Sequence, residues 1–298
     1  MLTIYVFFVN KKIFFDFLLF FFRFQLLLLD IDDGNEKKIN FALIFLYKMF
    51  YINHFLVMKL LLFFFALTLY INSVAQSGIV FSFSSDGNSV ILNEIKYKSA
   101  KNVDYAICQC QFFISNVKIK MKNGKKIEFD NFVHYVDIEI ANTQKAVFPT
   151  EIDLHQADSI EFTFGIDSAL NISRRFKNPP ENLMFWPDYL GGGYHYMKTN
   201  IKYIDKQGFT SAFNCHIGRG QVYDENDNPI NYIENTFVVK LPIKIANTST
   251  GTFATINLNI SKIFNFPNAV DFNDYRGIMD NQQAMSIFCE NLKTAFSN

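Results

Sequence analysis

The chain has 298 residues, of which 50% are hydrophobic and 19% charged, and its 28 basic residues balance 28 acidic ones. A nucleic-acid-binding surface needs clustered lysine and arginine to displace phosphate counterions. The balanced charge, with no long basic or acidic run, therefore argues against a nucleic-acid partner. The length allows one or two domains.

The first quarter of the chain is apolar and does not resemble a folded domain. Residues 1–29 are almost entirely Phe, Leu, Ile and Val. One interpretation is a transmembrane anchor over Leu2 to Leu29. The interpretation we prefer is that residues 1–57 are upstream sequence read as protein, with translation starting at Met58 or Met49.

Residues 58–75 have the layout of a secretory signal peptide. One lysine precedes an apolar run from Leu60 to Ile71, and the small residues Ser73-Val74-Ala75 follow. These are the basic region, apolar region and cleavage site of such peptides, and the run is short for a membrane-spanning helix. We expect cleavage before Gln76, a mature chain (76–298) that does not span the membrane, and a periplasmic or extracellular location.

The mature chain has the pattern of many short strands joined by polar turns. Apolar and polar residues alternate in INLNI (256–260), and an Asn-Gly pair at 123–124 indicates a hairpin turn. This pattern predicts a single all-β domain, an antiparallel β-sandwich with long loops. Strands are expected at 79–83, 105–114, 116–121, 127–129, 132–140, 159–166, 194–204, 211–217, 235–245 and 251–260.

One helix is expected, at the C-terminus. Between Asn281 and Phe296, apolar residues recur at helical spacing, which predicts an amphipathic helix lying on the sandwich. These residues are Ala284, Ile287, Phe288, Leu292 and Ala295.

The four cysteines are Cys108, Cys110, Cys215 and Cys289. An oxidising compartment permits disulfides, and four cysteines allow three pairings, which stay open. Cys108 with Cys110 is the least favoured pair, because two positions on one strand face give poor disulfide geometry.

The most unusual segment surrounds the single tryptophan, Trp186, in the sequence LMFWPDYLGGGYHYMK (183–198). Three consecutive glycines indicate special backbone angles or a close approach of chains. The sequence carries no nucleophile elbow, no phosphate-binding glycine loop and no Cys-x-x-Cys metal motif. We therefore expect a protein that is not an enzyme, and take the Trp186 segment as the lead to its function.

Several blocks together resemble one family. In chain order they are QFFISNV (111–117), FTFGIDSALNIS (162–173), NLMFWP (182–187) and FNCHIG (213–218), followed by the terminal helix. They are similar to the MbnP-like copper-binding family, which comprises secreted or periplasmic β-rich proteins related to the methanobactin-associated protein MbnP. The similarity spans nearly all of residues 78–298, and the FGIDS and MFWP blocks are its most specific parts.

The resemblance implies a copper(I) site used in copper acquisition or handling. In the family, two histidines and a tryptophan oxidised to kynurenine hold copper at a surface site, and a di-haem cytochrome c peroxidase-like partner performs the oxidation. By position, Trp186 matches the modified tryptophan and His216 the second histidine.

The first family histidine, two residues after the tryptophan, is replaced here by Asp188. Copper(I) is soft and prefers imidazole, thiolate or thioether to a carboxylate. The site is therefore altered, or another residue completes it. His195 is the nearest candidate, and Cys215 and Met184 are soft alternatives, although strand neighbours such as Cys215 and His216 point to opposite faces.

Each candidate also has a structural interpretation. Trp186 can close the end of the sandwich, and His195 and His216 can be structural packing residues. His134 and His155 are expected to be surface or packing residues. The second functional hypothesis is a secreted binding or structural module without metal. In that hypothesis Trp186 and the nearby tyrosines, Tyr189, Tyr194 and Tyr196, contact a protein or glycan.

Overall fold

A computed structural model describes residues 76–298 except 227 and 276, and before them only positions 47, 48, 51, 54 and 57–59. Chain contacts divide the protein into two units, Met1–Ser73 and Val74–Asn298. The predicted upstream segment (1–57) and signal peptide (58–75) lie outside the described residues, apart from those isolated positions. In the part of the chain that is described, no helix has the length and apolar character needed to cross a membrane.

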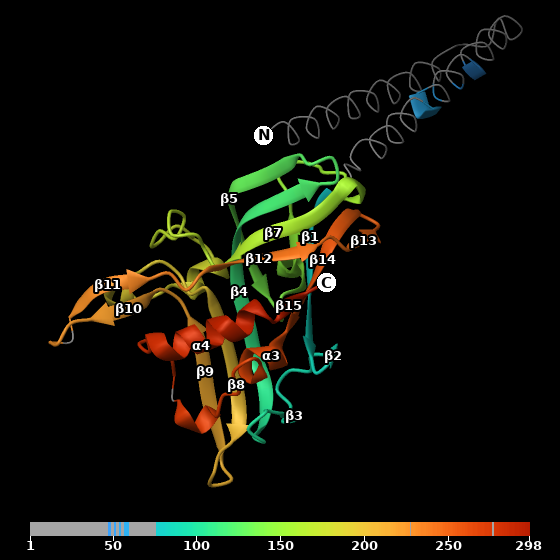
Figure 1. Cartoon of the computed structure of the whole chain (residues 1–298). Helices are drawn as coiled ribbons and strands as arrows, with labels where there is room; N and C mark the ends of the chain where they lie inside the picture. The colour runs from blue at the N-terminus through green and yellow to red at the C-terminus, as the bar shows by residue number, and fades with distance from the viewer. Residues whose placement is uncertain are drawn as a thin grey trace, which may run out of the picture. The chain divides into compact units, whose positions relative to one another are not determined.

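The larger of two main sheets in the second unit is organised around one long strand, β4 (Figure 1). Its order is β12-β7-β4-β8-β9, and β3 and β5 also pair with β4. All these pairings are antiparallel. The strands are β3 (Tyr97–Lys98), β4 (Asp104–Met121), β5 (Lys126–Asp137), β7 (Ala157–Phe164), β8 (Met197–Ile204), β9 (Thr210–Ile217) and β12 (Phe237–Pro242).

The smaller sheet joins the first strand of the second unit to strands near the C-terminus. Its order is β13-β14-β1-β2, with β15 paired to β14 and β6 to β1. The strands are β1 (Gln76–Ser85), β2 (Asn88–Ser89), β6 (Lys145–Val147), β13 (Ile245–Thr248), β14 (Gly251–Asn259) and β15 (Phe296–Ser297). The all-β sandwich-like prediction is confirmed. Among the pairs formed by the described strands, β1 with β14 is parallel rather than antiparallel, which the long chain between these strands permits.

Aromatic side chains fill the space between the sheets. Phe81 of β1 contacts Phe112 and Phe162 of the larger sheet, with ring centroids 5.5 and 6.3 Å apart and nearly perpendicular planes. Phe296 of β15 lies 5.9 Å from Phe112. Edge-to-face packing of this kind is favourable for aromatic pairs, and it fixes the two sheets against each other.

Two helices cover part of the larger sheet, α3 (Ile260–Asn265) and α4 (Gln282–Lys293). The Asn281 side chain caps α4 by accepting a hydrogen bond from the backbone N–H of Ala284. Phe288 of α4 lies 5.8 Å from Phe213 of β9. The predicted terminal helix is therefore confirmed, but it ends before Phe296, which joins the smaller sheet instead.

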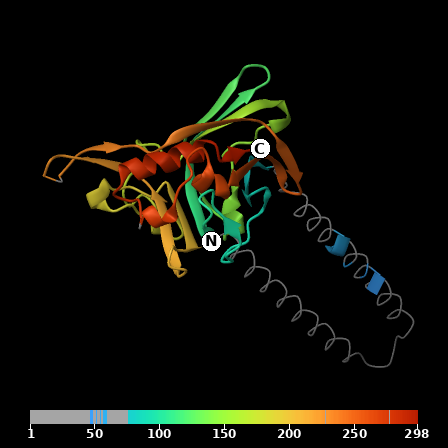
Figure 2. The same ribbon diagram turned by 60° about the horizontal axis from the view of Figure 1, so that its bottom comes forward.

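Some boundaries differ from the sequence prediction because irregular residues lie inside strands. The strands expected at 105–114 and 116–121 form the single strand β4, in which Asn116 has φ 49° and the pairing shifts between Ser115 and Val117. Such a bulge adds a residue without ending the strand. The hairpin of β10 (Gly220–Tyr223) and β11 (Pro229–Ile233), which the sequence did not predict, projects from the sheets in both ribbon views (Figures 1 and 2).

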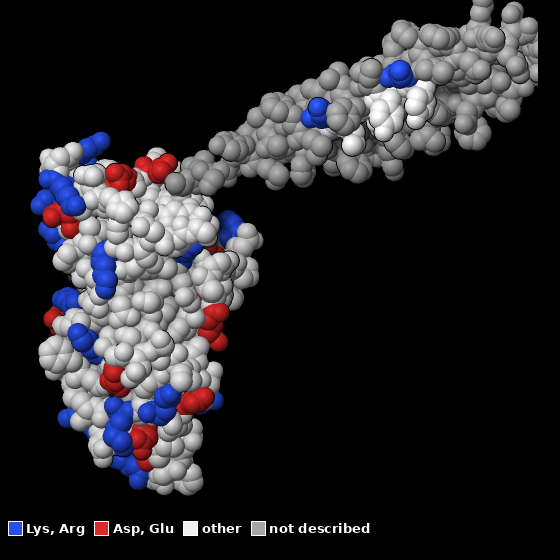
Figure 3. Space-filling model, turned by 90° about the vertical axis from the view of Figure 1, so that its right-hand side faces the viewer, with Lys and Arg blue, Asp and Glu red and all other residues white. Residues whose placement is uncertain are grey.

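Charged residues of both signs are mixed on the face shown in Figure 3, as the balanced composition predicts, but the four cysteines form no disulfide. Uncharged areas lie between the charged side chains on this face. All four cysteines are free, and three of them, Cys110, Cys215 and Cys289, are buried. None of the three disulfide pairings left open by the sequence is formed.

Candidate metal centre

The triple glycine shapes the loop that carries Trp186. Gly191, Gly192 and Gly193 have φ of 103°, 65° and 86°, values that favour glycine. A Cβ on Gly193 would lie 2.4 Å from the side chain of Asn171. The loop closes through a hydrogen bond of 3.0 Å from the Trp186 backbone N–H to the Gly193 carbonyl. Both the special angles and the close approach expected from the sequence are therefore present.

Trp186 itself is completely buried. Its indole Nε1 donates a hydrogen bond of 3.0 Å to the Leu190 carbonyl. The ring packs on Gly218, where an added Cβ would come within 2.6 Å of two ring atoms. Trp186 therefore does close this end of the core, as the structural interpretation predicts, and it is not a surface residue.

The structure also brings Trp186 together with two of the candidate histidines. The ring centroids of Trp186 and His195 are 4.7 Å apart with planes at 82°. His195 and His216 follow at 5.1 Å and 84°. His195 lies just before β8, and His216 belongs to β9, which pairs with β8, so the two imidazoles come from neighbouring segments.

Hydrogen bonds assign a tautomer to each imidazole. Nδ1 of His195 lies 3.0 Å from the Met184 carbonyl, so this nitrogen carries the proton. Nε2 of His216 lies 2.9 Å from Oδ1 of Asn200, and Nδ2 of Asn200 donates to Oε1 of Gln109 at 2.8 Å. The proton of His216 is therefore on Nε2.

Each histidine consequently keeps one nitrogen lone pair, Nε2 on His195 and Nδ1 on His216. Nε2 of His195 is buried and has no hydrogen-bond partner. A buried polar atom left unpaired is costly and calls for an explanation. Histidines that bind metals almost always donate their other N–H to a carbonyl or carboxylate group, which is the arrangement of both rings.

Both histidines are held neutral. Burial lowers the pKa of His195 to about 3, with additional lowering by the charges of Lys198 and His216. Burial and Lys198 lower the pKa of His216 to about 4. Because only the neutral imidazole can bind a metal, both rings are ready to act as ligands at neutral pH without losing a proton.

A cleft of about 450 Å³ reaches the centre from the His216 side. The backbone of Gly277 bridges to Asn214 of β9, which brings residues 277–280 to the cleft wall beside His216. Met279 lies on this wall, and its thioether is a soft donor of the kind that copper(I) accepts. The sequence pattern gave no signal for Met279, because only the fold brings it to the cleft.

The sequence model of the MbnP family matches residues 75–284. The chain therefore belongs to the MbnP family. A comparison with curated proteins found no match. Among solved structures, MbnP from Methylosinus trichosporium is similar, with 12% sequence identity and a TM-score of 0.43, over 68% of this chain and 79% of that chain.

Asp188 stands where the resemblance to the MbnP family expects a histidine. In the structure it contacts side chains other than the two histidines. Its carboxylate accepts a hydrogen bond of 3.3 Å from Ser173 and lies 3.9 Å from Arg174. It lines a separate cavity of about 430 Å³ together with Arg174 and Lys177. The structure therefore groups Asp188 with basic side chains, whereas His195 takes the place beside His216.

The soft alternative Cys215 faces the core, opposite to His216 as strand alternation requires. Burial raises the pKa of its thiol well above the usual range, and the neighbouring thiols Cys289 and Cys110 raise it further. A neutral thiol is a poor metal ligand. Among the described residues, no group of three or more His, Cys, Asp or Glu side chains is arranged to hold a metal.

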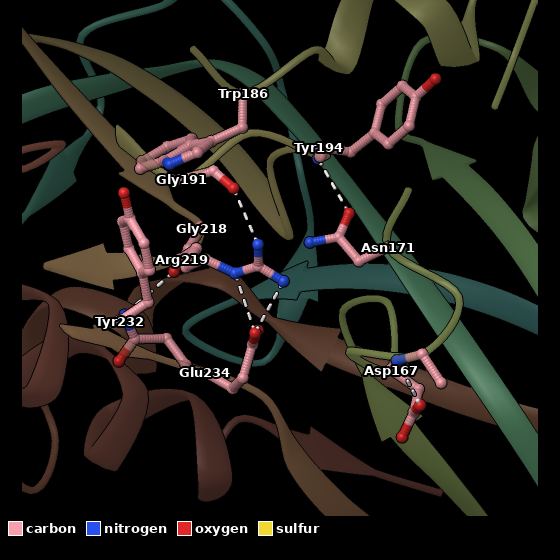
Figure 4. Close-up of polar contacts among 12 residues, drawn as sticks. Asp167, Asn171, Trp186, Gly191, Tyr194, Gly218, Arg219, Tyr232 and Glu234 are labelled. Atoms are coloured by element: carbon pink, nitrogen blue, oxygen red, sulfur yellow. Dashed lines mark hydrogen bonds and ion pairs between the residues drawn. The ribbon is translucent and has the colours of Figure 1, made fainter. Parts of the chain in front are cut away.

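A polar network beneath the Trp186 loop holds it in place (Figure 4). The Arg219 guanidinium lies between the Gly191 carbonyl, at 2.7 Å, and the Glu234 carboxylate, at 2.8 Å. Glu234 also accepts a short hydrogen bond from Tyr196. Neither Arg219 nor Glu234 was predicted from the sequence, although Arg219 directly follows the family block FNCHIG.

Proposed function

We propose that this protein binds copper(I) through Nε2 of His195 and Nδ1 of His216. The observation that carries the proposal is the pair of neutral imidazoles, 5.1 Å apart, each with one N–H bound to a carbonyl oxygen. Two neutral nitrogen donors match the preference of a soft monovalent ion better than that of a hard divalent one. Asp188 is not required in this site.

The chain's own residues prepare the site in three ways. The Met184 carbonyl and Asn200 fix the tautomers, burial keeps the rings unprotonated, and the cleft beside His216 provides access. Bound copper would supply a redox-active cation next to the Trp186 indole. Membership of the MbnP family supports a role in copper acquisition or handling in the periplasm or outside the cell, and a binding protein rather than an enzyme.

The proposal extends to Trp186, which we take to be the residue converted to kynurenine with a di-haem peroxidase-like partner. Two equivalents of peroxide would cleave the C2–C3 bond of the indole to give N-formylkynurenine and two waters, and hydrolysis would then release formate. Because the indole is completely buried, such a partner would act without touching the ring. Mass spectrometry of the protein isolated with and without that partner tests this step. A mass increase confined to the Trp186 peptide supports it, and an unmodified peptide in both samples contradicts it.

A copper(I) titration against a coloured chelator, under reducing conditions, tests the binding site. We expect one equivalent to bind the wild-type protein, and H195A and H216A each to lose at least tenfold in affinity. H155A is the matched control, because His155 is exposed and should leave binding unchanged. Equal affinity in all four proteins would contradict the proposed site.

The alternative function, an aromatic binding loop without metal, finds less support in the structure. Of the aromatic residues expected to meet a partner, Trp186, Tyr194 and Tyr196 are buried. Tyr189 is 75% exposed and alone among the four faces outward. Loss of partner binding in W186A, with metal content at background in the wild type, would favour this alternative.

A further inference from the structure

Lys198 places a positive charge beside the two histidines. It is the partner of His216 directly across the β8–β9 pairing, and Cβ atoms of such partners are about 4.5–5.5 Å apart. The Lys198 ammonium donates a hydrogen bond of 2.6 Å to the Leu183 carbonyl. The next carbonyl along the chain, that of Met184, is the one that holds Nδ1 of His195. Lys198 is therefore fixed next to both candidate ligands.

The positive charge of Lys198 disfavours protonation of both imidazole rings. It contributes to the lowered pKa of His195 and of His216, after burial. Burial lowers the pKa of Lys198 as well, while the Leu183 carbonyl stabilises its ammonium form. Any cation bound between the histidines would meet the same repulsion that disfavours their protonation.

We propose that Lys198 makes the two-histidine site selective for monovalent over divalent metal ions. Coulomb repulsion by the ammonium grows in proportion to the charge of the bound ion. Copper(I) is therefore repelled about half as strongly as copper(II) or zinc(II), which also bind imidazole well. The inference rests on the proposed copper function and deepens it, since it explains how a site without thiolates rejects divalent ions.

The test compares K198Q, K198R and K202Q with the wild type. Glutamine removes the charge but can still donate a hydrogen bond to Leu183, and arginine keeps the charge. Lys202 is the matched control, because it is exposed and lies four residues further along the same strand. Affinities for copper(I), copper(II) and zinc(II) are measured by competition with chelators, and the copper reduction potential by voltammetry.

We expect K198Q to gain about tenfold in affinity for copper(I) and about a hundredfold for each divalent ion, on the order of tenfold for each unit of ion charge. The ratio of the copper(I) affinity to the copper(II) affinity thus falls about tenfold. Because copper(II) gains more than copper(I), the reduction potential of bound copper falls by about 59 mV. K198R and K202Q should keep the wild-type ratio. A structural disturbance would instead lower all affinities together.

Two results would overturn the inference and are distinguishable. If the wild type binds no copper(I), the proposed function fails and the inference fails with it. If the wild type binds copper(I) but K198Q keeps the wild-type ratio, or K198R changes it as much as K198Q does, only the role of Lys198 is refuted.

Discussion

Gly218 and Trp186 are in direct contact, with no room for a side chain on the glycine. A Cβ at position 218 would lie 2.6 Å from Cδ2 and Cε3 of the indole. Gly218 is two residues after His216, so the segment that supplies a candidate ligand also supplies the floor on which Trp186 packs. The tryptophan and the histidine pair therefore form one structural unit.

This contact predicts that G218A destabilises the protein by about 1–3 kcal/mol, the usual cost of overpacking a close-packed core. The indole must move, so the fluorescence of the chain's single tryptophan should shift to longer wavelength. The matched control is G277A, because a Cβ at Gly277 meets nothing within 4 Å. Thermal denaturation measures the stability of both variants, and emission spectra measure the tryptophan wavelength. Equal stability and equal wavelength in G218A and G277A would contradict the packing of Trp186 on Gly218.

The Arg219–Glu234 pair predicts strong coupling between two substitutions. R219M leaves the partly buried Glu234 carboxylate without its cation, and removing one partner of such a pair costs more than removing both. We expect R219M to lose about 1–3 kcal/mol of unfolding free energy, and the double variant R219M/E234Q to recover part of that loss. A double-mutant cycle by chemical denaturation measures this, and simple additivity would argue against the network.

Asn200 is predicted to act through the tautomer of His216. In N200L the imidazole loses its acceptor at Nε2, and loss of such outer partners typically costs about 10- to 100-fold in metal affinity. Q109L, which removes only the partner of the Asn200 amide, should cost less. Copper(I) titrations of the two variants rank them, and unchanged affinity in N200L would contradict the assigned tautomer.

The lowered histidine pKa values predict a pH-dependent stability. In the folded protein the pKa is about 3 for His195 and about 4 for His216, against about 6.5 in an unfolded chain. Between pH 6.5 and about 4, the unfolded chain therefore binds more protons than the folded one. Acidification through this range should lower the unfolding free energy, by up to about 1.4 kcal/mol per pH unit for each histidine.

Denaturation at several pH values checks this, with the H195Q/H216Q variant as the reference that cancels the contribution of the other titrating groups. The difference in unfolding free energy between the wild type and the variant should be constant above pH 7 and become less favourable to the wild type below pH 6.5. A difference that does not change with pH would mean that the rings are not held neutral by burial.

The fold was largely predictable because it follows local patterns. Alternation and turn residues place most strands, and the spacing around Phe288 places the terminal helix. The parallel pairing of β1 with β14 was not predictable, since it joins segments more than 150 residues apart that show no local signal. The sequence pattern separates strands at 105–114 and 116–121, because it carries no signal for the bulge through which β4 continues at Asn116.

The candidate site was predictable only in part. The family blocks pointed to Trp186 and His216, and the adjacent segment to His195. Asp188 was a candidate because it occupies the position of the first family histidine, but in the fold its carboxylate contacts Ser173 and Arg174. Lys198, Asn200 and Met279 could not be identified, because their roles arise from strand register and from a bridge between distant segments.

The central claim is that copper(I) binds Nε2 of one histidine and Nδ1 of the other. Nitrogen-15 NMR of histidine-labelled protein distinguishes the four ring nitrogens of His195 and His216 from one another. Adding one equivalent of copper(I) should shift Nε2 of His195 and Nδ1 of His216, while the protonated Nδ1 of His195 and Nε2 of His216 keep their hydrogens. Shifts at the opposite nitrogens, or no shift at either ring, would contradict the account.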